Sequence, residues 1–153
     1  MRLNRFIALS GVCARREADK LIAAGKIKIN GNVVSELGTK VIPVDDKVTY
    51  KGEALRIRKF VYLLLNKPKN TITTTSDPSG RRTVMDFIKN ATDQRVYPVG
   101  RLDRNTTGLL LLTNDGELAE KITHPSYKIR KIYHVQLERP MEEEDMQKLL
   151  EGV

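Results

Sequence analysis

Apolar residues at the start of the chain recur at the spacing of a helix. The first of them are Leu3, Phe6, Ile7 and Leu9. This spacing predicts a short first helix that stops at Ser10-Gly11. A second helix is predicted over residues 15–24, because Gly25 follows it and glycine favours the left-handed conformation that often ends a helix.

Short strands are predicted next, from alternating apolar and polar positions. Residues 26–29 and 32–34 alternate on either side of Asn30-Gly31, a pair typical of a tight hairpin turn. Apolar positions within residues 41–50 predict two more short strands. Residues 51–59 are charged and without a strong period, so we expect a linker there.

Longer apolar runs mark the second half of the chain. Residues 60–65 are almost all apolar, which is typical of a strand buried on both faces, and Pro68 stops it. The runs 96–99 and 109–112 flank a polar segment bracketed by two glycines. This arrangement predicts a strand, a connection and a strand, with Asp103 at the exposed tip of the connection.

The spacing of apolar residues predicts four further elements. They are a short helix at residues 84–88, a helical turn or two at 117–123, an alternating strand at 131–137, and a helix that starts at Pro140.

Charge narrows the class of partner. The chain has 27 Lys and Arg against 19 Asp and Glu, a net charge of +8. Residues 1–58 carry +6 of it and residues 59–153 carry +2. A basic surface implies a partner rich in negative charge, most often nucleic acid, although a charge of this size also keeps a protein soluble.

Composition also limits the chemistry. Cys13 is the single cysteine, so no internal disulfide can form, and with two histidines a dedicated zinc site is not expected. The apolar runs are too short to span a membrane, and the N-terminus lacks the pattern of a signal peptide. We therefore expect a cytoplasmic protein with no metal and no membrane partner.

Asp103 is the first candidate for chemistry. Arg101 and Arg104 flank it, and nearby positive charge favours the ionised carboxylate that a nucleophile needs. The alternative is that Asp103 closes a turn with its side chain. A calcium loop also matches the first places of this segment, but its twelfth place is Asn114 and not a bidentate glutamate.

Basic residues near the N-terminus are candidates for RNA contact. Two arginines stand in the first turn of the second predicted helix, where backbone N–H groups favour an anion. The alternative is a solvated charged face with Glu17 and Asp19 as partners. The residues expected to contact RNA phosphates are Arg2, Arg5, Arg15, Arg16 and Lys20.

These motifs resemble a known family. Gly100-Arg101-Leu102-Asp103, with the glycine and leucines that follow, is similar to the active-site motif of ribosomal RNA pseudouridine synthases, in the subfamily that modifies one position of small- or large-subunit rRNA. Lys67-Pro68 resembles the pair after that family's first strand, and residues 131–135 match its Lys-x-Tyr-x-Val strand. Two helices and a basic hairpin resemble the RNA-binding module named for ribosomal protein S-four, which often has serine where this chain has Ala14.

The resemblance implies an α+β protein of two parts. An S-four-like α/β module would occupy residues 1–58, and the N-terminal part of a pseudouridine synthase domain, with a mixed or antiparallel sheet, residues 59–153. It implies an isomerase that converts one uridine of ribosomal RNA to pseudouridine without a cofactor. The expected partner is a structured stem-loop of ribosomal RNA, bound by a monomer.

The resemblance also implies roles for single residues. Asp103 would be the nucleophile, Arg101 would assist base flipping, and Tyr133 would stack on the uracil. Thr106 and Lys131 would complete the substrate site. The family's domain continues past the last residue of this chain with an arginine that pairs with the aspartate, so we expect part of a longer enzyme.

Two other functions remain open at this point. A ribosome-associated RNA-binding protein, or an inactive fragment, would use the second part as a docking surface. An acid-dependent hydrolase would need a second carboxylate near Asp103, whereas Asp115 and Glu117 follow the far end of the 109–112 run.

Overall fold

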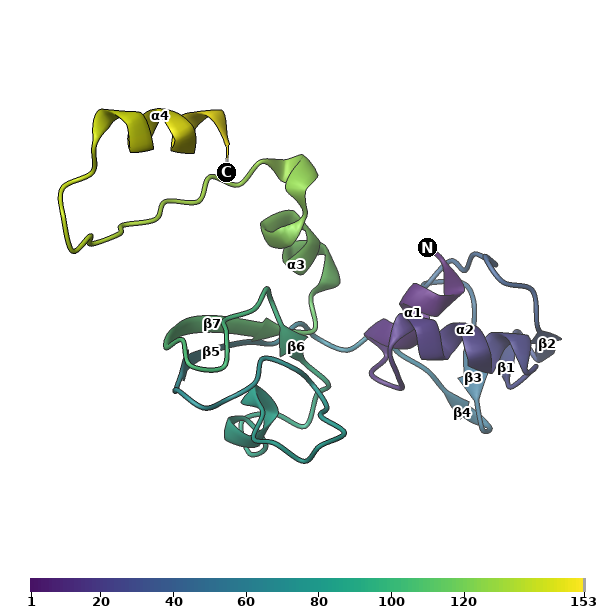
Figure 1. Cartoon of the computed structure of the whole chain (residues 1–153). Coiled ribbons are helices and arrows are strands. Elements are labelled where there is room, and N and C mark those ends of the chain that lie inside the picture. The colour runs from purple at the N-terminus through teal and green to yellow at the C-terminus, as the bar shows by residue number, and fades with distance from the viewer. Residues whose placement is uncertain (153) are drawn as a thin grey trace.

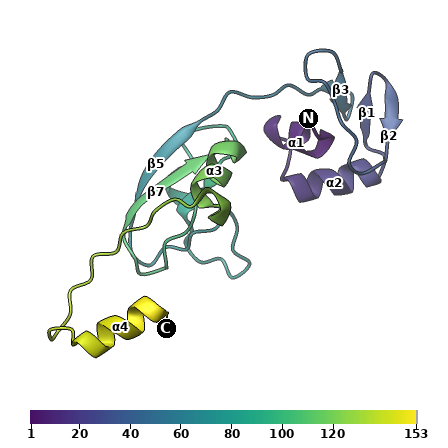
Figure 2. The ribbon, with the colours of Figure 1, turned by 90° about the horizontal axis from the view of Figure 1, so that it is seen from above.

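Two small sheets, each with its own core, make up most of the chain. The computed structural model describes residues 1–152. Figure 1 shows the N-terminal unit with α1, α2 and β1 to β4 beside a second unit with β5, β6 and β7, and a strand-free stretch of chain between them. The last helix, α4, lies at the end of an extended arm, apart from both units (Figures 1 and 2).

The N-terminal unit packs two helices against an antiparallel sheet. The sheet has the order β2-β1-β3-β4. Both predicted helices and the predicted hairpin are present, and Asn30 and Gly31 form the turn with φ of 50° and 86°. The elements are α1 (Leu3–Leu9), α2 (Arg15–Ala23), β1 (Ile27–Ile29), β2 (Asn32–Val34), β3 (Val48–Tyr50) and β4 (Glu53–Ala54).

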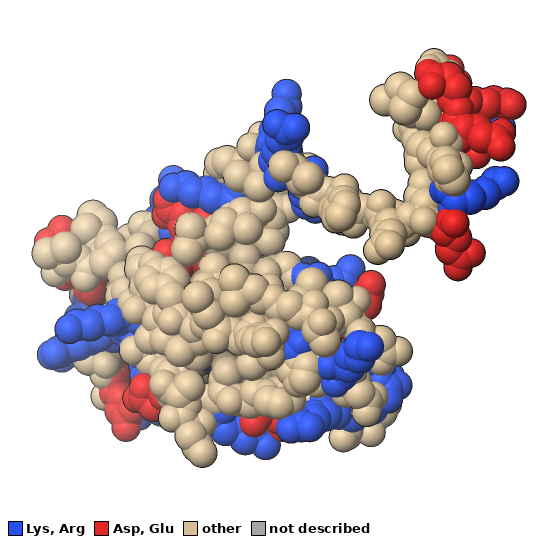
Figure 3. All heavy atoms as spheres, turned by 90° about the vertical axis from the view of Figure 1, so that its left-hand side faces the viewer, with Lys and Arg blue, Asp and Glu red and all other residues tan. Residues whose placement is uncertain are grey.

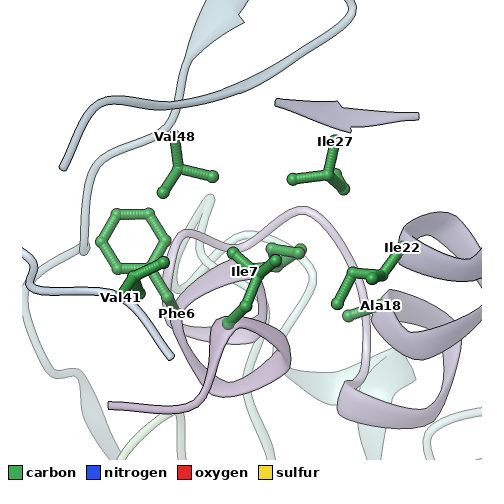
Figure 4. Close-up of a cluster of buried hydrophobic side chains, with 8 residues drawn as sticks. Phe6, Ile7, Ala18, Ile22, Ile27, Val41 and Val48 are labelled. Atoms are coloured by element: carbon green, nitrogen blue, oxygen red, sulfur yellow. The ribbon is translucent and has the colours of Figure 1, made fainter. Parts of the chain in front are cut away.

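The core of this unit comes from residues that share one side of each element. Phe6 and Ile7 of α1 meet Ile22 of α2, with Ile27 and Val48 from the sheet above them (Figure 4). All five are at most 2% exposed. Burial of apolar surface from both helices therefore holds the sheet in place.

Two expectations for this unit were wrong. Residues 41–44 form no strand, because Pro43 interrupts them, and one isolated bridge joins Arg2 to Lys40. The linker begins later than residue 51, since β4 pairs with β3 and Leu55 packs against the first core. The charged side chains of this hairpin face solvent and hid its strand from a search for apolar periodicity.

The second unit is a three-stranded antiparallel sheet of order β5-β7-β6. The register pairs Lys67, at the end of β5, with Gly108, at the start of β7. Val84, Val96 and Leu112 form its core together with partly buried side chains of β5. Its elements are β5 (Tyr62–Lys67), the 3-10 helix η1 (Val84–Phe87), β6 (Tyr97–Pro98) and β7 (Gly108–Thr113).

β5 is covered on one face and not on two as expected. Leu63 and Leu65 point toward the core, whereas Tyr62 is 51% and Leu64 69% exposed. Leu109 of β7 is 71% exposed beside them. An almost continuous apolar run therefore does not by itself prove burial on both sides, because the covering layer must come from other residues.

The C-terminal part contains helices but not the predicted strand. α3 (Gly116–Thr123), η2 (Pro125–Tyr127) and α4 (Glu143–Glu151) form. Residues 131–137 are extended and highly exposed but belong to no sheet, because among residues 1–152 no strand pairs with them. α4 begins after Glu142, three residues later than Pro140 suggested. Figure 3 shows acidic side chains gathered at the end of this arm.

Within residues 1–152, no helix is both long and apolar enough to cross a membrane. The same residues contain no group of three or more His, Cys, Asp or Glu side chains that could hold a metal ion.

Candidate active site

Asp103 lies on an exposed loop between two paired strands. Tyr97 of β6 pairs with Thr113 of β7, and the loop connects the other ends of these strands. Gly100 and Gly108 bracket the loop with φ of 75° and 145°, a region that favours glycine. The predicted strand, connection and strand are therefore confirmed, with Asp103 at the exposed tip.

The buried ammonium of Lys67 supports the loop from below. Lys67 is 0% exposed, and four backbone carbonyl oxygens accept hydrogen bonds from its buried Nζ. It donates to Asp103 O at 2.9 Å, Thr106 O at 2.8 Å, Pro68 O at 3.2 Å and Arg104 O at 3.3 Å. Hydrogen bonds to a charged donor are stronger than neutral ones, so Lys67 fixes the backbone of Asp103 and of the residues that follow it.

Two threonines hold the loop from its other side. Thr73 Oγ1 donates to Leu102 O at 2.7 Å and accepts from Leu102 N at 3.3 Å. The N–H of Thr71, which is fully buried, donates to Arg104 O at 3.2 Å. Leu102 also packs its side chain against the second core. The backbone on either side of Asp103 is therefore anchored although its side chain faces solvent.

Arg101 and Arg104 do not pair with the carboxylate as expected. Arg104 Nε donates instead to Asn70 Oδ1 at 2.7 Å. Asn70 has a φ of 59°, so it adopts the left-handed conformation that a glycine would favour at this turn. Asp103 and Arg101 are both exposed, and neither makes an ion pair within 4.0 Å in residues 1–152. Both side chains can therefore meet a ligand.

Thr106 is part of this framework through its backbone. Its N–H donates to Asp103 O at 3.0 Å while its carbonyl accepts from Lys67. The backbone of Thr106 therefore contacts the backbone of Asp103 directly. Its hydroxyl is exposed at the surface of the loop.

Tyr133 and Lys131 are not brought to Asp103. Both lie on the extended arm, and Tyr133 is 78% exposed. The arm between η2 and α4 extends away from the sheet that carries the loop (Figures 1 and 2). The structure of this chain therefore gathers Asp103, Arg101 and Thr106 in one place and leaves Tyr133 and Lys131 elsewhere.

The five basic residues of the N-terminal unit have different surroundings. Arg5 pairs with Glu117 of α3 at 3.1 Å, and Lys20 pairs with Glu17 at 3.1 Å. Arg2 precedes α1 as its N-cap residue. Arg15 and Arg16 stand exposed in the first turn of α2, which has no side-chain cap because Ala14 precedes it.

Arg81 and Arg82 stand at the end of the polar, threonine-rich residues 71–82, and both have partners inside the second unit. Arg81 hydrogen-bonds Asp77 at 2.7 Å, and this contact lowers the pKa of Asp77 to about 2. Arg82 lies over the ring of Phe87, 4.2 Å from its centroid. Both contacts shape the segment that carries Thr73.

The second carboxylate that a hydrolase would need is not beside Asp103. Asp115 caps α3 at the opposite end of β7 and accepts hydrogen bonds from Glu117 N, Leu118 N and the Tyr62 hydroxyl. Partial burial raises its pKa, but these hydrogen bonds outweigh that effect and lower it. Asp115 is thus a structural capping residue.

Sequence reasoning missed the supporting residues. Lys67 was assigned no role of its own, although a lysine that ends a strand of leucines is unusual enough to signal a buried cation. Thr73 and Asn70 gave no signal, because their contacts join residues about thirty positions apart.

Comparison with known proteins identifies the family. Residues 61–150 match the family described as RNA pseudouridylate synthase, and residues 1–46 match the S4 domain. The chain belongs to the RNA pseudouridylate synthase family and carries an N-terminal S4 domain. Its α+β architecture, with antiparallel sheets, is therefore that of an S4 domain followed by part of a synthase domain.

Relatives match the chain over its whole length. It is 47% identical over 152 residues to "Ribosomal large subunit pseudouridine synthase B" of Bacillus subtilis, covering 99% of this chain and 62% of that protein. It is 44% identical to an "Uncharacterized RNA pseudouridine synthase" of Aquifex aeolicus, covering 100% and 61%. A solved structure, "Crystal structure of pseudouridylate synthase", shares 33% identity over 83% of this chain and 54% of that one, with a TM-score of 0.45. The chain thus spans about three fifths of the length of these two curated relatives.

Proposed function

We propose that the protein that contains this chain isomerises a uridine of ribosomal RNA to pseudouridine. The observation that carries the proposal is the anchored loop, in which Lys67 and Thr73 hold the backbone while the Asp103 carboxylate is exposed. Catalytic groups must be held in place by residues that are themselves fixed. The family and the name of the Bacillus subtilis relative support the same conclusion.

Asp103 supplies the nucleophile in this proposal. The reaction breaks the bond between the ribose C1′ and N1 of uracil, turns the ring, and joins C1′ to C5, while a proton leaves C5 and one is gained at N1. The product is an isomer of the substrate, so there is no net oxidation or hydrolysis. An exposed carboxylate on a rigid loop can reach a base that has left its helix.

The other roles follow the resemblance and remain part of the proposal. Arg101, exposed beside Asp103, enters the space that the base vacates. Thr106 fixes the loop behind the nucleophile. Tyr133 stacks on the uracil and Lys131 lies on the same segment, which requires the extended arm to reach the loop when RNA binds or when further residues of the protein pack on it.

The S4 domain anchors the RNA in this account. Arg15 and Arg16 present guanidinium groups at the start of α2, and they have no ion-pair partner in residues 1–152. Arg2, Arg5 and Lys20 add positive charge on the same two helices. Such residues position the protein on the phosphates of a structured stem-loop but do little to distinguish one RNA sequence from another.

We propose a domain division after Arg58. Its backbone N–H donates to Leu9 O at 3.1 Å and its Nε donates to Ser10 O at 3.1 Å, so Arg58 belongs to the first unit. The domains are then residues 1–58 and 59–153. We infer that the protein acts as a monomer in the cytoplasm, where ribosomal RNA is modified.

A second function, RNA binding without catalysis, is favoured by the distance of the arm from the loop. Mapping of pseudouridine by carbodiimide and primer extension separates the two. Ribosomal RNA is incubated with this chain and with a version extended to the length of its relatives. A new stop given by either one supports the synthase; binding without any stop from both supports the alternative.

A further inference from the structure

A cleft lies between the two units. Apart from Arg5, Arg15 and Arg16, which the proposed function already assigns to RNA phosphates, its lining residues have no role in the proposed mechanism. Its volume is about 700 Å³. One wall comes from α1 and the start of α2, and the other from the end of the linker, β6 and the start of α3. The side chains that matter for its chemistry are Arg15, Arg16, Phe60, Arg95 and Tyr97.

Three arginines of the cleft are unpaired. Arg15, Arg16 and Arg95 are exposed, and none makes an ion pair or side-chain hydrogen bond within the described chain. Arg95 comes from the second unit, whereas Arg15 and Arg16 come from the first, and all three line the same cleft. Arginine side chains from both units therefore meet at one space.

Aromatic rings line the same space. Phe60 is 48% exposed, although it is a large apolar residue, and Tyr97 is half-buried. An exposed ring beside unpaired arginines is an arrangement that can hold unpaired nucleotides, since a base stacks on the ring while arginines contact its phosphates.

Most polar groups that could read the edge of a base are already engaged. Asn114 accepts from Val61 N and donates to Lys59 O and Gln94 Oε1. The acids Asp115 and Glu117 are held by the α3 cap and by Arg5. Glu120 has no such partner in residues 1–152, so phosphates belong beside the three arginines and away from this side chain of α3.

We propose that this cleft binds one unpaired nucleotide of the RNA, with its base on Phe60 and its phosphates on Arg15, Arg16 and Arg95. The proposal rests on the proposed function, because it assumes that RNA is the substrate. It adds a second contact that is distinct from the Asp103 loop and that favours RNA with a single-stranded segment next to a helix. Recognition is by stacking, so the cleft accepts any base.

Fluorescence tests this directly, since the chain contains no tryptophan. Phe60→Trp places a single reporter in the cleft, and Tyr127→Trp is the matched control because Tyr127 is 49% exposed and lies outside the cleft. The probes are a fully paired RNA duplex and the same duplex with five unpaired nucleotides at each end. We expect quenching of Phe60→Trp by the extended duplex only, and none in Tyr127→Trp.

Affinity gives a second readout. Phe60→Leu should weaken binding of the extended duplex by about tenfold, the lower part of the range for one stacked base, and leave the paired duplex within about twofold. Arg95→Gln should lower the slope of log affinity against log salt by about 0.7 for the extended duplex alone.

Equal quenching by both duplexes, equal quenching in the control, or an extension that adds no affinity would overturn the cleft proposal and leave the proposed function standing. Failure to bind either duplex would contradict both.

Discussion

The buried ammonium of Lys67 lies 2.9 Å from the backbone carbonyl oxygen of Asp103, 36 positions later in the chain. The two residues are brought together by the register of β5 and β7, which pairs Lys67 with Gly108. The sheet therefore positions Lys67, and the hydrogen bond from Lys67 fixes the backbone of the candidate nucleophile, Asp103.

Replacement of this cation should unfold the loop. Lys67→Met keeps the length and removes the charge, so carbonyls of Asp103 and Thr106 lose their donor in a buried site. We expect a loss of about 2 to 4 kcal/mol in the free energy of unfolding, measured by urea denaturation. Lys69→Met is the control, because Lys69 is exposed and makes no ion pair in residues 1–152, and it should change stability by less than about 0.5 kcal/mol. Equal losses of stability in Lys67→Met and Lys69→Met would contradict the conclusion that Lys67 holds the loop in place.

The Thr73 hydroxyl should matter more than its size suggests. It donates to Leu102 O and accepts from Leu102 N, so Thr73→Val removes two hydrogen bonds and adds no bulk. The expected cost is about 1 to 2 kcal/mol, with faster hydrogen exchange at the Leu102 amide. The exposed Thr75 provides the comparison, since Thr75→Val should leave that amide unchanged.

Asp77 should show an acid-side dependence of stability. Arg81 lowers its pKa from the ordinary 3.8 to about 2, so the ionised form is favoured in the folded state. The stabilisation is present above about pH 4 and is lost as the pH falls toward 2. Carboxyl NMR of Arg81→Gln should show the pKa of Asp77 returned toward 3.8, whereas Arg82→Gln, which removes a contact with Phe87, should not move it. An unchanged Asp77 titration in Arg81→Gln would contradict this cause.

Gly11 should be required for the junction of the two units. It has a φ of 85°, and a Cβ there would lie 3.0 Å from Arg58 Nε, the group that donates to Ser10 O. Gly11→Ala should therefore cost more stability than Gly38→Ala, which has a similar φ of 87° but open space around it. We expect about 1 kcal/mol for the strain alone at Gly38 and roughly 1 kcal/mol more at Gly11. Equal losses of stability in Gly11→Ala and Gly38→Ala, measured by thermal unfolding, would show that the Arg58 side chain moves aside without cost.

Patterns in the sequence correctly predicted those elements that depend on contacts between neighbouring residues or that have a regularly spaced apolar face. α1, α2 and the Asn30-Gly31 hairpin follow from helical spacing, a glycine stop and a turn pair. The predicted strand at residues 131–137 failed because alternation states only which face is apolar, and a strand also needs a partner for its backbone.

The exposed loop that carries Asp103 was predictable from the sequence, but the residues that hold this loop in place were not. Asp103 stood out through the glycines and arginines around it, and the structure places it at an exposed tip. Lys67, Thr73 and Asn70 act through tertiary contacts, which no local pattern encodes. Arg104 was expected to face Asp103 and instead contacts Asn70, because the left-handed turn at Asn70 presents its amide oxygen to the guanidinium.

The most direct test of the account is the activity of Asp103→Asn in the protein extended to the length of its relatives. The change keeps the size and hydrogen-bonding backbone of residue 103 and removes its charge. Asp45→Asn makes the same change in charge on an exposed side chain of the other unit. We predict that Asp103→Asn binds ribosomal RNA with unchanged affinity and forms no pseudouridine in the carbodiimide map, while Asp45→Asn matches the wild type. Wild-type turnover by Asp103→Asn would contradict the assignment of the nucleophile.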